Sequence, residues 1–169
     1  MTAMSNASHR ERRKTTTRMI ELEVQSASSV ETIPGVLDFG TWLATAVDGP
    51  DDVSLVIRVV DEAEMQDLNA RYRGLDKTTN VLSFPSDVPE SIKQELEAAP
   101  LGDIVICAPV VEAEAQAQGK PPMDHWAHLS IHGLLHLLGH NHEEEDEAVR
   151  MEAMEIACLE TLGIPDPYK

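Results

Sequence analysis

The chain has 169 residues, of which 42% are hydrophobic and 25% are charged, and its formal net charge at pH 7 is −17. This length favours one domain with a substantial core, and no apolar run approaches the ~20 residues of a membrane span, so we expect a protein without membrane contact. The negative charge argues against broad binding to a nucleic-acid backbone, which needs a basic field, and we expect no DNA partner.

Residues 1–18 form a basic segment that differs from the rest of the chain. They hold five basic residues and one acidic residue, lack hydrophobic periodicity, and are expected to be a disordered tail. Residues 19–169 are then a single acidic domain with eight basic and 29 acidic residues. The two cysteines, Cys107 and Cys158, have apolar neighbours, which predicts buried, reduced thiols in a cytoplasmic protein.

Apolar alternation and β-branched runs predict four strands, and periodic segments ended by glycine predict the helices between them. The strands are expected over 19–25, 53–60, 80–85 and 101–108. The helices are expected over 34–49, from 61 to about 72, over 109–118, from 124 to 139 and over 143–162, with one short helix in the acidic loop 86–100. Strands and helices do not alternate strictly, so we expect an α+β fold, a single domain with a small mixed sheet of about four strands packed against helices.

Particular side chains are expected to begin the helices and to face the core. Asp61 and Glu64 resemble a capping box, and Asp124 is expected to cap the helix that carries most of the histidines. The apolar positions of helix 34–49 are Val36, Leu37, Trp42, Leu43 and Val47. The apolar face of the last helix is expected to hold Val149, Ala153, Ile156, Leu159 and Leu162.

Residues 132–142 read HGLLHLLGHNH and contain four of the seven histidines. His132 and His136 are four residues apart, so on a helix their side chains lie on one face about 6 Å apart and can share an ion. Gly139 can adopt the left-handed conformation that ends a helix, and the turn can then bring in His142 as a third ligand. Three neutral histidines leave a fourth position open, which is typical of a catalytic zinc site with one ion.

Ordinary core or surface histidines are the alternative interpretation, but the leucines between them draw the helix into the core and put the histidine face in a pocket. His128 lies one turn before His132, and His125 lies nearly a turn earlier, so either could replace or support a ligand. His140 is expected to point away from the ion. The predicted metal site therefore lies on a helix in the C-terminal half and on the turn after it.

The histidine spacing matches the metzincin peptidase pattern H-E-x-x-H-x-x-G-x-x-H, with one difference. Position 133 is Gly, whereas those peptidases have the glutamate that activates water. A metallopeptidase is therefore a less favoured alternative. A nucleobase deaminase would need H-x-E and P-C-x-x-C motifs, and the chain has neither.

A basic group lies in the acidic domain, where Arg71, Arg73 and Lys77 fall within seven residues near the end of a predicted helix. Cations at that place could reach a phosphate. They could equally belong to an ordinary solvated helix end, which composition alone favours.

Three longer motifs follow one another along the chain. They read D-L-N-x-x-Y-R-G-x-D-K-x-T-N-V-L-S-F-P from residue 67, L-G-D-I-V-I from residue 101 and H-W-A-H-L-x-x-H-G-x-L-H-L-L-G-x-x-H from residue 125. In this order they resemble the bacterial YbeY endoribonuclease family, over nearly the whole chain from about Met19. The resemblance implies a single-strand-specific, metal-dependent endoribonuclease that acts in ribosomal RNA maturation, notably at the small-subunit 3′ end, and in ribosome quality control. It also implies that His132, His136 and His142 bind zinc and that Arg73 is functionally important.

Two positions depart from the family pattern. Asn141 stands where the family usually has Asp, and because Asn cannot act as a base, an acid or base role is not expected there. Thr78 stands in place of Pro, a change expected only to loosen the loop.

The mechanism expected from these residues is metal-assisted hydrolysis of RNA phosphodiesters. Zinc would lower the pKa of bound water toward ~7 or polarise a phosphoryl oxygen. Arg73 would bind the scissile phosphate and stabilise its developing charge. The expected partners are single-stranded ribosomal RNA and ribosomal or ribosome-assembly proteins. A non-catalytic, zinc-containing ribosome-assembly factor stays open as an alternative, since an acidic surface favours a protein partner.

Overall fold

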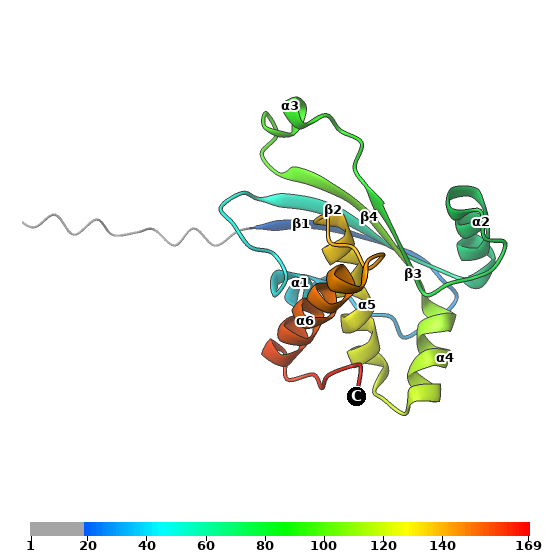
Figure 1. The fold of residues 1–169 in the computed structure, drawn as a ribbon. Coiled ribbons are helices and arrows are strands. Elements are labelled where there is room, and N and C mark those ends of the chain that lie inside the picture. The colour runs from blue at the N-terminus through cyan, green and yellow to red at the C-terminus, as the bar shows by residue number, and fades with distance from the viewer. Residues whose placement is uncertain (1–18) are drawn as a thin grey trace, which may run out of the picture.

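The strands form one sheet in the computed structural model, which describes residues 19–169 (Figure 1). The strands are β1 (Ile20–Ala27), β2 (Val53–Val60), β3 (Val81–Pro85) and β4 (Ala99–Cys107). The helices are α1 (Val36–Ala44), α2 (Glu62–Arg73), α3 (Glu90–Lys93), α4 (Ala108–Gln118), α5 (Pro122–Leu137) and α6 (Glu145–Thr161). The predicted α+β fold is confirmed, whereas the predicted tail over 1–18 lies outside the described residues.

The sheet is mixed, and its strand order is β1-β2-β4-β3. β1, β2 and β4 run parallel, and β3 pairs antiparallel with β4. In the central strand β2, Val53, Leu55, Ile57 and Val59 are buried and alternate with half-buried residues along most of the strand. This alternation directs one face of the sheet toward the main core.

Helix α5 is the centre of the main core, between the sheet and helices α1 and α6 (Figure 1). Its Trp126 and Leu134 belong to the same buried cluster as Phe39 of α1, Ile104 of β4 and Leu159 of α6. Burying each large apolar side chain stabilises the fold by roughly 1.5–3 kcal/mol. A rigid, buried α5 therefore provides a fixed support for the histidines that it carries.

The opposite face of the sheet is covered only in part. Met65 of α2 is buried there against Val60, Leu82 and Val105. Toward the beginning of β1, Glu21 and Glu23 are exposed, as is Asp103 of β4. Part of this face is therefore open and acidic.

Part of the prediction was wrong for helices α1 and α5, although Trp42 and Leu43 of α1 are buried as predicted. In α1, Val36 and Leu37 are 49% and 84% exposed. The helix ends at Ala44 instead of continuing to residue 49, and the Thr45 hydroxyl donates to Trp42 O at this end. Helix α5 begins at Pro122 with Pro121 as its N-cap, so Asp124 lies in the first turn instead of capping the helix. Proline suits the first position of a helix, which Pro122 occupies, because its fixed φ is that of a helix and it has no N–H to satisfy.

The predicted capping box of α2 does not form. The Asp61 carboxylate accepts hydrogen bonds from Ser28 Oγ and from the backbone N–H of Ser29, and Glu64 pairs with Arg58 at 2.6 Å. These long-range contacts hold the two acids away from the helix start.

The buried face of α6 also differs from the predicted one, since Val149 and Ala153 are exposed. Of the predicted residues Leu159 is buried, Ile156 and Leu162 are half-buried, and the face also buries Met151, Glu155 and Cys158. Both cysteines are buried and unpaired, as predicted. None of the helices within residues 19–169 combines the length and the apolar character required to cross a bilayer.

Candidate functional site

The packing of α5 against the sheet decides which of its faces carries the histidines. Gly133 lies at the closest approach, where a Cβ atom would be 2.8 Å from Ile104 Cγ2 and 3.2 Å from Ser83 Oγ. The Ser83 hydroxyl donates to Gly133 O at 2.9 Å and ties β3 to the helix. Even a methyl group at position 133 would therefore displace its neighbours, and His132 and His136 face a different direction.

A glycine turn after α5 returns the chain toward these two histidines. Gly139 has a φ of 93°, in the left-handed region, and its N–H donates to His136 O at 3.0 Å. The N–H of His140 donates to Leu135 O at 3.0 Å. These two bonds form a Schellman motif, which satisfies carbonyls at the helix end and lets His142 approach the helix from outside.

The three predicted ligands come together at this turn. His132, His136 and His142 each offer one nitrogen, and these atoms lie within 4.8 Å of one another. The Nε2 atoms of His132 and His136 are 3.1 Å apart. His132 and His136 are half-buried and His142 is exposed, so the group is open to solvent on one side.

The other ring nitrogens indicate how the two helix histidines are protonated. His136 Nδ1 lies 3.0 Å from His140 O, and since a carbonyl can only accept, this nitrogen carries a proton. His132 Nδ1 lies 2.5 Å from the Glu155 carboxylate, which also accepts. In neutral rings both Nε2 atoms then present lone pairs toward each other. Such a pair fits a shared cation, so this donor set suits a divalent metal with nitrogen ligands.

The electrostatics of His136 favour the neutral ring that a metal requires. Burial, together with the nearby His132 and His142, lowers the pKa of His136 to about 4. At neutral pH this ring is therefore neutral, and no proton has to leave its Nε2 before that atom binds a metal.

Arg73 lines the same cleft as the three histidines. The cleft has a volume of about 530 Å³ and is lined by Arg73, Val81, Leu82, Ser83, Pro85, His132, His136, Gly139, His140, Asn141, His142 and Glu143. Arg73 is the last residue of α2, and its Nη2 donates to Ser83 O at 2.8 Å. Its guanidinium also lies over the Phe84 ring, 5.4 Å from the centroid.

The three predicted cations therefore do not act as one group. Arg71 pairs with Asp67 at 2.9 Å and, like Lys77, does not line the cleft. Ser83 connects the two halves of the site, because its carbonyl holds Arg73 while its hydroxyl holds α5.

His125, His128 and His140, the other histidines of residues 19–169, lie outside the three-histidine group. His125 is buried, and its Nε2 is 2.6 Å from the Glu114 carboxylate. His128 Nε2 is 2.9 Å from Glu155 Oε2, so His128 shares this carboxylate with His132. His140 contributes its carbonyl to His136.

Glu155 is the residue that the sequence analysis missed. It is 1% exposed, and it accepts hydrogen bonds from His128, His132 and the Tyr168 hydroxyl. Burial opposes its ionisation, but these three hydrogen bonds outweigh burial and lower its pKa to about 2. A signal was present, because Glu155 lies four residues from both Met151 and Leu159, in the middle of a buried face.

The comparison with known proteins agrees with the motifs in the sequence. A family model described as Endoribonuclease YbeY matches residues 11–163, which is most of the chain. Among solved structures, the chain is similar to the solution structure of TM1509 from Thermotoga maritima. The identity is 21%, the TM-score is 0.48, and the match covers 89% of this chain and 99% of that one.

Proposed function

This chain belongs to the YbeY endoribonuclease family, and from that premise we propose a single-strand-specific, metal-dependent endoribonuclease of the cytoplasm. Its proposed substrate is ribosomal RNA, cleaved during maturation of the small-subunit 3′ end and in ribosome quality control. The observation that carries the proposal is that Arg73 and the three histidines line one open cleft. A phosphodiester in this cleft can meet a metal centre and a guanidinium at the same time.

We propose that His132, His136 and His142 hold one zinc ion, and that Glu155 and the His140 carbonyl hold the Nδ1 protons of the first two. When bound, the ion would supply Lewis-acid activation of water and of the phosphoryl group. The chain itself would keep the ligand rings neutral and oriented. Asn141 lines the cleft and can hydrogen-bond a substrate, but its amide does not transfer protons.

Arg73 is proposed to bind the scissile phosphate. Within residues 19–169 its guanidinium makes one hydrogen bond, to Ser83 O, so several N–H donors stay available for phosphate oxygens. The Phe84 ring and the Ser83 carbonyl fix its direction. A fixed guanidinium stabilises the charge that develops on the phosphoryl oxygens better than a mobile one.

The test is cleavage of single-stranded RNA by highly purified protein, with and without a chelator. His136→Ala and Arg73→Glu are expected to abolish cleavage, while Arg71→Glu, on the same helix but outside the cleft, is the matched control. Cleavage by His136→Ala or Arg73→Glu at the wild-type rate would contradict the proposal. Hydrolysis of casein in place of RNA would support a peptidase, although position 133 has no room for the glutamate of that mechanism.

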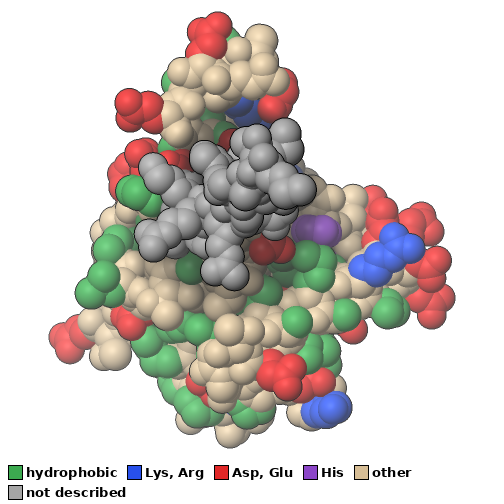
Figure 2. All heavy atoms as spheres, turned by 90° about the vertical axis from the view of Figure 1, so that its left-hand side faces the viewer, with side chains coloured by type: hydrophobic (Ala, Val, Ile, Leu, Met, Phe, Trp, Pro, Cys, Tyr) green, Lys and Arg blue, Asp and Glu red, His purple; other side chains and the backbone are tan. Residues whose placement is uncertain are grey.

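A second candidate role, in ribosome assembly, is favoured by the open face of the sheet. A groove of about 760 Å³ is lined there by Glu21, Glu23, Asp87 and Asp103, beside the rings of Tyr72 and Phe84. Burial and the nearby Glu23 raise the pKa of Asp103. Figure 2 shows acidic side chains spread widely over one face of the molecule, with Lys and Arg in few places. Carboxylates beside aromatic rings suit an arginine-rich or lysine-rich protein segment, such as those of ribosomal proteins.

This partner can be tested separately from catalysis. Glu21→Lys with Glu23→Lys is expected to weaken retention of ribosomal proteins by the immobilised protein, while cleavage of short naked RNA stays unchanged. Glu160→Lys, an exposed change on α6, is the control. Equal retention by wild type and the double variant would refute the groove as a docking site. Zinc removal that unfolds a protein without any RNase activity would favour a non-catalytic assembly factor.

A further inference from the structure

Glu155 is a buried carboxylate at the centre of a small cluster. It receives donors from one helix, α5, and from the C-terminal segment: His128 Nε2 at 2.9 Å, His132 Nδ1 at 2.5 Å and the hydroxyl of Tyr168. Within residues 19–169 no Lys or Arg pairs with it. A buried charge without a cationic partner is costly unless its oxygens are fully hydrogen-bonded.

The two carboxylate oxygens have different partners. Oε1 accepts from His132, whereas Oε2 accepts from His128 and Tyr168. The second pair of donors holds the carboxylate in one orientation and leaves Oε1 directed at His132. Because a carboxylate can only accept, His132 Nδ1 must carry the proton, and its Nε2 is left with a lone pair.

We infer that Glu155 is the positioning residue of the metal centre, which fixes the tautomer and the ring plane of His132. This inference rests on the proposed metal site. The positive charge of an ion on His132 Nε2 is then compensated, one ring away, by the negative charge of Glu155. Carboxylates placed in this way behind a histidine ligand raise the basicity of that ligand and hold its ring.

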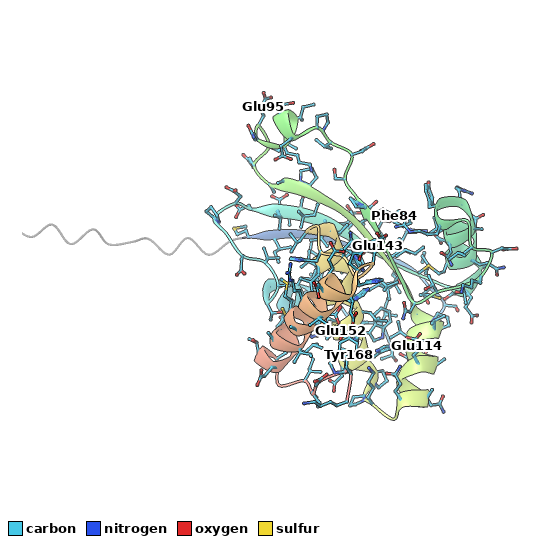
Figure 3. The ribbon with its side chains drawn as sticks, viewed as in Figure 1. Phe84, Glu95, Glu114, Glu143, Glu152 and Tyr168 are labelled. Atoms are coloured by element: carbon cyan, nitrogen blue, oxygen red, sulfur yellow. The ribbon has the colours of Figure 1, made fainter. Side chains whose placement is uncertain are left out.

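The C-terminal segment also helps to hold Glu155, through the hydroxyl of Tyr168. Tyr168 is the penultimate residue, and its ring meets the His128 ring edge-on with centroids 5.5 Å apart. Figure 3 shows Tyr168 at the lower end of α5, whereas Glu143, which lines the cleft, and Phe84, whose neighbours Ser83 and Pro85 line it, lie near the upper end. Glu155 therefore connects the C-terminal segment to His132, and neither Glu155 nor Tyr168 lines the cleft.

The first test measures zinc affinity by competition with a chromophoric chelator, and the visible spectrum of the cobalt-substituted protein. Glu155→Gln is expected to weaken zinc binding about 10–100-fold and to change the cobalt spectrum. Tyr168→Phe is expected to cause a smaller loss, because Oε2 keeps its bond from His128. Glu160→Gln, on the exposed side of α6, should bind zinc as the wild type does. A folded Glu155→Gln protein with wild-type zinc affinity would overturn the inference. Wild-type zinc affinity in Tyr168→Phe would show that Tyr168 plays no part in positioning Glu155.

A second measurement needs no variant and decides the matter if Glu155→Gln does not fold. Nitrogen-15 NMR of the metal-free wild type is expected to show that, at a pH where the His132 ring is neutral, its proton is on Nδ1. A proton on Nε2 with a bare Nδ1 would overturn the inference. Failure of the proposed function is distinguishable, because a protein that binds zinc without cleaving RNA still gives both readouts.

Discussion

Replacing Gly133 by alanine is expected to destabilise the protein, and shortening Ile104 is expected to reverse the sign of that effect. The new Cβ would lie 2.8 Å from Ile104 Cγ2, against about 3.5–4.0 Å for an ordinary carbon contact. Overpacking of this kind costs about 1–3 kcal/mol. Alanine also gains about 1 kcal/mol of helix propensity over glycine. The expected net loss in the free energy of unfolding is therefore about 0–2 kcal/mol.

In an Ile104→Ala background, the overlapping Cγ2 and the nearby Cδ1 atoms are gone. Gly133→Ala should then stabilise that protein by about 1 kcal/mol, the propensity gain without the overlap. Urea unfolding of the four proteins gives the coupling energy as a double-mutant cycle. Gly40→Ala in α1 is the control, because a Cβ there meets nothing within 4 Å. The same destabilisation by Gly133→Ala in both backgrounds would refute the close-packing argument.

Three further predictions concern the site and its surroundings. Arg73→Lys should lower the rate of RNA cleavage roughly 10²-fold, since lysine cannot reproduce the fixed guanidinium; a rate equal to that of Arg71→Lys would contradict this. Zinc at about 100 times its Kd should raise the free energy of unfolding of the wild type by about 2.7 kcal/mol, measured by calorimetry or urea unfolding. His136→Ala should show no such gain, and an equal gain in the two proteins would place the ion elsewhere. Burial lowers the pKa of His125, despite its hydrogen bond to Glu114, so the unfolded chain takes up the proton first as pH falls below about 6.5. The stability advantage of wild type over His125→Asn should therefore shrink between pH 8 and pH 5.5, and a constant or growing advantage would show that His125 does not resist protonation.

The sequence contained enough information for the strands, the order of the elements and the three clustered histidines. These features depend on local signals: β-branched runs, glycine at helix ends, and a four-residue spacing that any α-helix converts into one face. Gly139 illustrates this, because its predicted turn and its left-handed φ of 93° follow from a glycine placed directly after the periodic residues of the helix.

Features that depend on contacts between distant segments could not be derived in this way. Asp61 and Glu64 had the pattern of a capping box, yet Ser28 and Arg58 engage their carboxylates instead. Glu155 was not predicted to be buried, because a carboxylate rarely is, and the hydrogen bonds from His128 and His132 explain its position. Composition alone did not separate Arg73 from Arg71: the resemblance to the family pointed to Arg73, and only Arg73 of the two lines the cleft.

The direction of α5 has a consequence for the order in which ligands bind. Both α5 and α2 end beside the cleft, with His136 in the last turn of one and Arg73 as the last residue of the other. The C-terminal end of a helix carries a partial negative charge of about half an electron, which attracts cations and repels anions. Together with the charge of Glu143, these partial charges exceed the single positive charge of Arg73, so an RNA phosphate meets a repulsive field until a metal ion is in place. The metal is thus expected to bind first, and RNA affinity should rise with metal occupancy.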